Sequence, residues 1–146
     1  MGKKYLVALD GSKAAMHALN YAITLAEVTN AELELLTVVP PVFLPSYSIY
    51  VLKSEAISDC AKELEISFRG VLSKALNEIR KTKPELKVST KFEKGEPYAR
   101  IVETAKEGKF DLIIMGRRGA GGRATVLGSV SCRVIDESPC PVLIVK

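Results

Sequence analysis

The residues best suited to chemistry lie in one glycine-rich segment, residues 116–131, which reads GRRGAGGRATVLGSVS. It holds five glycines and three arginines, and it lies between an apolar run and a helix-like pattern. Glycines let the backbone approach an oxyanion closely, and the N–H groups at a helix start attract negative charge. Ser129 and Ser131 add hydroxyl donors. The segment therefore predicts a site for nucleotide phosphates.

Three other interpretations of this segment fit its residues less well. A plain surface loop, with Ser129 as an ordinary helix cap, would seldom need five glycines. A P-loop requires Lys and then Ser or Thr after G-x-x-x-x-G, whereas Gly122 and Arg123 follow here. A loose dinucleotide fingerprint occurs at residues 119–124, but no strand with a ribose-binding acid follows it. We treat that match as chance.

Catalytic groups are scarce in the rest of the chain. The single histidine, His17, falls within a predicted helix, where we expect a surface or packed residue rather than a base. Near the glycine-rich segment there is no nucleophile triad, no pair of carboxylates and no His/Cys cluster with metal spacing. We predict no catalytic residue and no protein-bound metal, so that any Mg²⁺ arrives with the phosphates.

Alternating strands and helices must position this segment. Five short β-prone runs are predicted, at residues 5–9, 33–39, 87–92, 111–115 and 142–145. Helical patterns occupy residues 12–30, 57–80 and 97–108 and begin again near 129, with an irregular stretch at 40–52. This order predicts an α/β fold, an open, doubly wound five-stranded parallel sheet with helices on both faces. Ligands bind such sheets where the strand order reverses, and the turn-rich strand ends are at Asp10 and Gly116.

The bulk composition fits one globular domain, with 146 residues of which 47% are hydrophobic and 26% charged. No apolar run approaches the roughly 20 residues that cross a bilayer, so no membrane association is expected. The net charge of +4 is spread along the chain, which argues against a nucleic-acid partner. Three cysteines without a pairing pattern favour a reducing cytoplasm, with the thiols as small core residues.

Several motifs together resemble the universal stress protein family over nearly the whole chain. They are a first strand ending in Asp10-Gly11-Ser12, a second ending in TVVP at residue 40, DLIIMG at 111–116, and SPCPVLIV at 138–145. ATP-binding members carry G-x2-G-x9-G-[ST], and here only eight residues separate Gly119 from Gly128-Ser129. The resemblance implies a single domain over residues 1–146 with an adenine nucleotide alpha hydrolase-like, Rossmann-like fold.

The resemblance also implies a binding site for an adenine nucleotide, with ATP as the expected ligand and Mg²⁺ carried by its phosphates. Carried over by position, the nucleoside would meet Ala8, Leu9, Asp10 and Val38. The ribose and phosphates would meet Met115, Gly116, Arg118 and Gly119, and the β and γ phosphates would meet Gly128, Ser129, Val130 and Ser131. Taken alone, Asp10 could equally cap the first helix, and Val38 could be an ordinary buried strand residue.

The expected function is that of a cytoplasmic ATP-binding regulatory or stress-response protein, in which the nucleotide acts as a signal and any ATP hydrolysis is slow. ATP, AMP and cyclic nucleotides stay open as ligands, as does the protein partner. One alternative is a dimeric interaction module of the same family that binds no nucleotide, which the shortened spacing favours. An adenylyl-transfer enzyme is a further alternative, but its S-G-G-x-D-S and H-I-G-H signatures are absent. The apolar strand 142–145 predicts a homodimer, because an uncovered edge would expose unpaired backbone groups.

Overall fold

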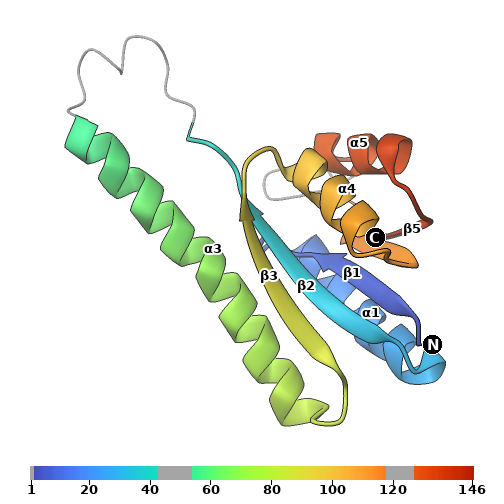
Figure 1. The fold of residues 1–146 in the computed structure, drawn as a ribbon. Coiled ribbons are helices and arrows are strands. Elements are labelled where there is room, and N and C mark those ends of the chain that lie inside the picture. The colour runs from blue at the N-terminus through green and yellow to red at the C-terminus, as the bar shows by residue number, and fades with distance from the viewer. Residues whose placement is uncertain (1, 43–53, 118–126) are drawn as a thin grey trace.

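The computed structural model describes residues 2–42, 54–117 and 127–146. Within these ranges strands and helices alternate, and the strands form one parallel sheet in the order β3-β2-β1-β4-β5 (Figure 1). The elements are β1 (Lys4–Ala8), α1 (Lys13–Thr29), β2 (Glu32–Val39), α3 (Ser54–Thr82), β3 (Val88–Lys94), α4 (Pro97–Glu107), β4 (Leu112–Gly116), α5 (Ser129–Glu137) and β5 (Val142–Val145). The predicted fold class and order of elements are confirmed.

The placement of the helices follows from the direction in which the chain crosses the sheet. From β1 the chain moves outward to β2 and β3, then returns to β4 and β5 on the other side of β1. Because parallel crossovers are right-handed, a reversal of direction moves the crossover helix to the opposite face. Accordingly α1 and α3 cover one face, and α4 and α5 cover the other (Figure 1).

Both faces of the sheet are buried, as a parallel sheet between two helical layers requires. Leu6 and Val7 are neighbours in β1 and both are 0% exposed, yet they belong to different hydrophobic clusters. Successive side chains of a strand point to opposite faces, so Val7 packs toward α1 and α3 while Leu6 packs toward α4 and α5. This explains why the strands read as nearly continuous apolar runs.

Capping residues mark the ends of α1 and the start of α4. The hydroxyl of Ser12 accepts a hydrogen bond from the N–H of Ala15 at 3.1 Å, so Ser12 is the N-cap of α1. The carboxylate of Asp10 instead accepts from the N–H of Ser12 at 2.9 Å and closes the turn before the helix. Asn30 ends α1 in the left-handed conformation, with φ 55°, and Pro97 opens α4.

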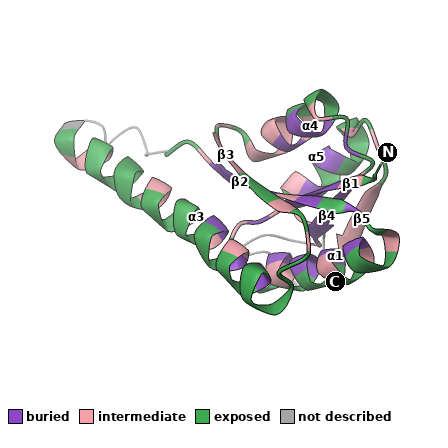
Figure 2. Cartoon of the chain, turned by 60° about the horizontal axis from the view of Figure 1, so that its bottom comes forward, coloured by how far each residue is buried: buried purple, intermediate pink, exposed green. Residues whose placement is uncertain are grey.

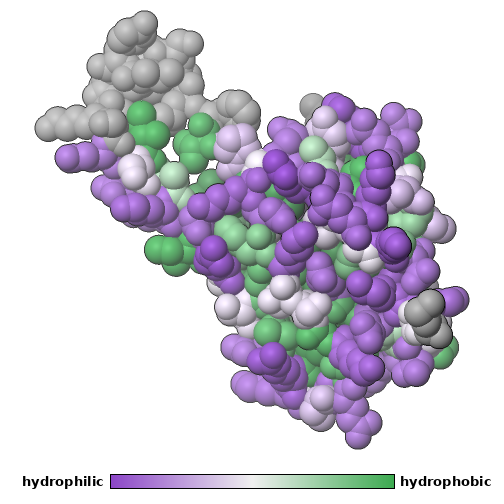
Figure 3. Space-filling view, viewed as in Figure 1, coloured by the Kyte–Doolittle hydropathy of each residue, from purple (hydrophilic) through white to green (hydrophobic). Residues whose placement is uncertain are grey.

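Helix α3 confirms the predicted helical pattern at residues 57–80, but it places only part of its apolar face in the core. That part is its second half, with residues such as Leu72, Ala75 and Ile79, while Ile57 and Leu64 are half-buried. A 29-residue helix is about 44 Å long, whereas the eight residues of β2 span about 26 Å. The first half therefore projects past the sheet, where it is largely exposed and carries apolar patches (Figures 1, 2 and 3).

The prediction of core cysteines is wrong for Cys60 and Cys132, whereas Cys140 packs against the cluster between the sheet, α4 and α5. Cys60 lies on the projecting half of α3 and Cys132 on the outer side of α5, and both are exposed, while Cys140 is half-buried. All three thiols are free of disulfides. His17 is exposed on α1, in keeping with the expected surface position. Among the described helices, none combines the length and apolar character needed to cross a membrane.

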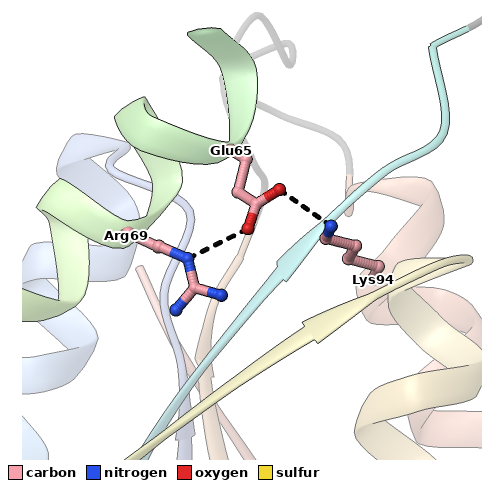
Figure 4. Close-up of polar contacts among 3 residues, drawn as sticks. All are labelled: Glu65, Arg69 and Lys94. Carbon is pink, nitrogen blue, oxygen red and sulfur yellow. Dashed lines mark hydrogen bonds and ion pairs between the residues drawn. The ribbon is translucent and has the colours of Figure 1, made fainter. Parts of the chain in front are cut away.

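A small charged cluster ties α3 to the carboxyl end of β3 (Figure 4). The carboxylate of Glu65 accepts hydrogen bonds from the ammonium group of Lys94 at 2.8 Å and from Nε of Arg69 at 3.1 Å. The Arg69 guanidinium lies 4.0 Å from the centroid of the Phe92 ring. The hydrogen bond from Lys94, followed by that from Arg69, holds the pKa of Glu65 below its ordinary value of 4.5.

We expect Glu65→Gln to lower the melting temperature at pH 7 and to have little effect in acid. A carboxyl group with a lowered folded-state pKa contributes stability above its ordinary pKa, and this contribution disappears as the pH falls through the folded-state value. The difference in melting temperature between the wild type and the variant should therefore shrink below pH 4.5. Glu63→Gln is the matched control, because Glu63 is exposed on the same helix and forms no ion pair with a described residue. A pH-independent difference would contradict the assignment.

Candidate functional site

A cavity of about 440 Å³ opens at the carboxyl edge of the sheet, beside the reversal between β1 and β4. This volume lies within the usual range of about 300 to 1,000 Å³ for small-molecule sites. Its walls come from the ends of β1, β2 and β4, the first turns of α1, α4 and α5, and one side of α3. The parallel sheet brings these segments together because all of its strands end at the same edge.

Ten of the twelve predicted site residues line this cavity. They are Ala8, Leu9, Asp10, Val38, Met115, Gly116, Gly128, Ser129, Val130 and Ser131. The other two, Arg118 and Gly119, lie outside the described residues. The structure thus gathers segments that are more than 100 residues apart in sequence, such as Ala8 and Gly128, into one cavity.

Sequence reasoning missed seven further residues of the cavity wall, which are Ser12, Ala15, Leu36, Pro40, Phe68, Pro97 and Ile101. Two of them could have been predicted, because Ser12 and Pro97 mark the helix starts that follow β1 and β3 at this edge. Nothing in the local sequence indicates that Phe68 lines the cavity. It occupies an apolar position within the regular pattern of α3 and reaches the cavity only through tertiary packing.

Gly116 is required by packing at the end of β4. A Cβ atom at this position would lie 2.7 Å from the carbonyl carbon of Ala14 and 2.8 Å from its Cβ, closer than atoms can approach without a shift of α1. The missing side chain lets the first turn of α1 lie directly against β4. Packing against α1 therefore requires glycine at residue 116, whether or not a phosphate binds there.

Ser131 fixes the start of α5 to the same strand. Its hydroxyl donates a hydrogen bond to the carbonyl oxygen of Gly116 at 3.0 Å, and the residue is only 2% exposed. A hydroxyl has one proton, so in this arrangement Ser131 cannot also donate to a ligand. The other predicted hydroxyl donor, Ser129, is exposed, and its hydroxyl forms no hydrogen bond with a described residue.

The N-terminus of α5 is an open hydrogen-bonding end. Gly128 is its N-cap, with φ −64° and ψ 155° and no side chain that could cap the first turn. The N–H of Gly128 donates to the carbonyl of Arg117 at 3.0 Å, but the N–H groups of the first helical turn have no partner within the helix. Ser129, Val130 and Ser131 line the cavity, so the positive end of the helix dipole adjoins it.

The two ends of the cavity differ in chemistry. At the β2 end the lining is apolar and includes Val38, Pro40 and Ile101, whereas at the β4 end it is the N-terminus of α5. β1 separates β2 from β4, so the two ends are about 10 Å apart. Asp10 lies between them, in the turn that follows β1, and its carboxylate favours a hydroxyl donor there and disfavours an anion.

A second, larger cavity of about 560 Å³ lies at the opposite, amino edge of the sheet. Four of its five charged lining residues form ion pairs, Lys83 with Glu27 at 2.8 Å and Lys87 with Glu32 at 3.4 Å, and the fifth is the carboxylate Glu85. The helix ends that border it are the C-termini of α1 and α3, where the dipole is negative. It therefore lacks the open donors of the carboxyl-edge cavity, despite its size.

The topology and the cavity at the strand reversal define an open, doubly wound α/β protein. A model of the Universal stress protein family matches residues 1–146. Universal stress protein MJ0531 of Methanocaldococcus jannaschii is 36% identical over 150 residues, which cover 99% of this chain and 82% of that relative. The chain therefore belongs to the universal stress protein family, as its motifs predict.

Solved structures agree with this membership over almost the whole chain. The protein MJ0577 superposes with a TM-score of 0.82 at 29% identity, covering 100% of this chain and 96% of its own. A universal stress protein crystallised in complex with cAMP gives a TM-score of 0.66 at 28% identity, and the match covers 99% of this chain and 96% of that protein's chain. The fold predicted from the alternation of elements is thereby matched by full-length relatives.

We expect Gly116→Ala to destabilise the protein and Gly70→Ala to stabilise it. The new methyl group at residue 116 would overlap the Ala14 backbone, which should cost about 1 to 3 kcal/mol and lower the melting temperature by roughly 3 to 10 °C. Gly70 is exposed within α3 and a Cβ there meets nothing within 4 Å, so alanine should gain about 0.8 to 1 kcal/mol. Thermal unfolding measures both. A Gly116→Ala variant as stable as the wild type would contradict the packing account.

Proposed function

We propose that this protein binds an adenine nucleotide, with ATP as the ligand, and acts as a nucleotide-dependent regulatory or stress-response factor. The observation that carries the proposal is the two-ended cavity, which is apolar at β2 and open to hydrogen bonding at the start of α5. A nucleotide has the same polarity, with an aromatic base at one end and phosphate at the other.

The polarity of the cavity also orients the ligand. The phosphates belong at the N-terminus of α5, where backbone N–H groups and the helix dipole favour negative charge. The base belongs beside Val38 and Pro40, and a ribose hydroxyl can donate to Asp10 between them. The reverse orientation would bring phosphate to apolar side chains and leave the helix end without a partner.

The cAMP complex of a relative 28% identical to this chain supports the proposal, since cAMP and ATP share base, ribose and phosphate. Among the described residues no group of three or more His, Cys, Asp or Glu side chains could hold a metal ion. Mg²⁺ would then enter as the complex with ATP, ligated by phosphate oxygens.

The proposed role of the nucleotide is that of a signal rather than a rapidly consumed substrate. Asp10 is the one titratable side chain among the described residues of the cavity wall, and it already accepts a hydrogen bond from Ser12. Unassisted GTPases turn over at roughly 10⁻⁴ to 10⁻³ s⁻¹, and we expect ATP hydrolysis here at that order or slower. The competing function, a family interaction module without nucleotide, is favoured by the eight-residue spacing before Gly128.

Mg-ATP should raise the melting temperature of the wild type. A ligand that binds only the folded state adds roughly 2.7 kcal/mol at 100 times its Kd, which is a shift of roughly 5 to 10 °C for a domain of this size. Gly128→Val should abolish the shift, because a branched side chain at the start of α5 would keep phosphate from the backbone donors. Its φ of −64° is accessible to valine, so the variant should fold.

A second variant separates the proposal from its competitor. Inserting one residue between Gly119 and Gly128 restores the spacing of ATP-binding family members, and it should leave the affinity for ATP unchanged or tighten it. If Mg-ATP raises the melting temperature of the insertion variant but not that of the wild type, the shortened spacing disables the site. The interaction module would then be the better account.

We further propose that the protein is a homodimer joined through β5. β5 is an edge strand whose four residues, VLIV, are all apolar and only half-buried. The other edge strand, β3, carries Lys91, Glu93 and Lys94, charges that discourage pairing with another strand. Light scattering should give twice the chain mass of 15.9 kDa. A monomer at micromolar concentration would rule out this assembly.

A further inference from the structure

Phe68 lies outside both hydrophobic core clusters of the described residues. It is half-buried on α3 and is the one aromatic side chain among the described residues that line the carboxyl-edge cavity. Its helical neighbours Val71 and Leu72 pack into the cluster between α1, α3 and the sheet, but within the described part of the chain Phe68 belongs to neither cluster. Phe68 therefore lines the cavity without belonging to either core cluster of the described residues.

The charged cluster of Figure 4 fixes the helical turn that carries this ring. Glu65 and Arg69 flank Phe68 on α3 and bind, respectively, Lys94 and the ring of Phe92 at the carboxyl end of β3. Lys94 pairs in register with Val39, one residue beyond Val38 on the adjacent β2. Because α3 packs against β2 and β3 whereas α5 packs against α4 and β5, Phe68 belongs to the wall of the cavity at its β2 end.

We propose that Phe68 contacts the nucleobase and determines the preference of this cavity for a base-bearing ligand over phosphate alone. The inference rests on the proposed nucleotide binding and specifies which wall of the cavity recognises the base. Stacking on an aromatic side chain suits any nucleobase, because every base has a π-face. The apolar residues Val38 and Pro40 then complete the base end of the site.

The first test compares ATP affinity among Phe68→Ala, Phe68→Leu and the wild type by calorimetry. Phe68→Ala should weaken ATP binding about 5- to 150-fold, the range found when base-stacking aromatics are replaced by alanine. Phe68→Leu keeps an apolar side chain but lacks the π-face, so it should also bind more weakly. Ile66→Ala is the matched control, since Ile66 lies on the same helix, is 70% exposed and does not line the cavity. Binding of ATP to Phe68→Ala within twofold of the wild type would overturn the inference.

If Phe68→Ala fails to fold, tryptophan fluorescence tests the contact between residue 68 and the base. The chain contains no tryptophan, so Phe68→Trp introduces a single tryptophan at the proposed contact, and its emission can be excited selectively at wavelengths where the five tyrosines hardly absorb. Its emission should change on addition of ATP or adenosine. Unchanged emission, while ATP still raises the melting temperature of this variant, would overturn the inference and leave the proposed function standing. If the wild type binds no ATP at all, the proposed function fails and the role of Phe68 fails with it.

Discussion

The reversal of strand order between β1 and β4 is the constraint on which the site depends. Because the chain leaves β1 in one direction and returns to β4 on its other side, right-handed crossovers place α1 and α3 on one face and α4 and α5 on the other. The helices that follow β1 and β4, α1 and α5, consequently begin at the same edge of the sheet and lie on opposite faces. The cavity forms at the edge from which they diverge, with the first turns of α1 and α5 in its walls.

Contacts within the protein hold the walls of this cavity in place. The Ala14 backbone packs against Gly116, and the hydroxyl of Ser131 holds the start of α5 to the carbonyl of the same glycine. On the other side, Glu65 and Lys94 hold α3 beside β3. Donors and apolar surfaces are therefore positioned before any ligand arrives, which lowers the ordering cost of binding.

Local patterns predicted most of the fold and much of the candidate site. Periodicity and turn residues located the strands and helices of the described ranges, and the rule for open parallel sheets brought Asp10 and Gly116 to one edge. Periodicity cannot tell where a neighbouring element ends, so the projection of α3 and the exposure of Cys60 were missed. The contacts of Gly116 and the orientation of Phe68 depend on residues distant in sequence, for which the chain offers no local signal.

In the proposed complex a nucleotide lies across the strand reversal, with its phosphates at α5 and its base at β2. A crystal structure of the protein with ATP would show this arrangement. We expect phosphate oxygens about 3 Å from backbone nitrogens in the first turn of α5, and adenine beside Val38 and Phe68. A nucleotide in the reverse orientation, or one bound outside this cavity, would contradict the proposal.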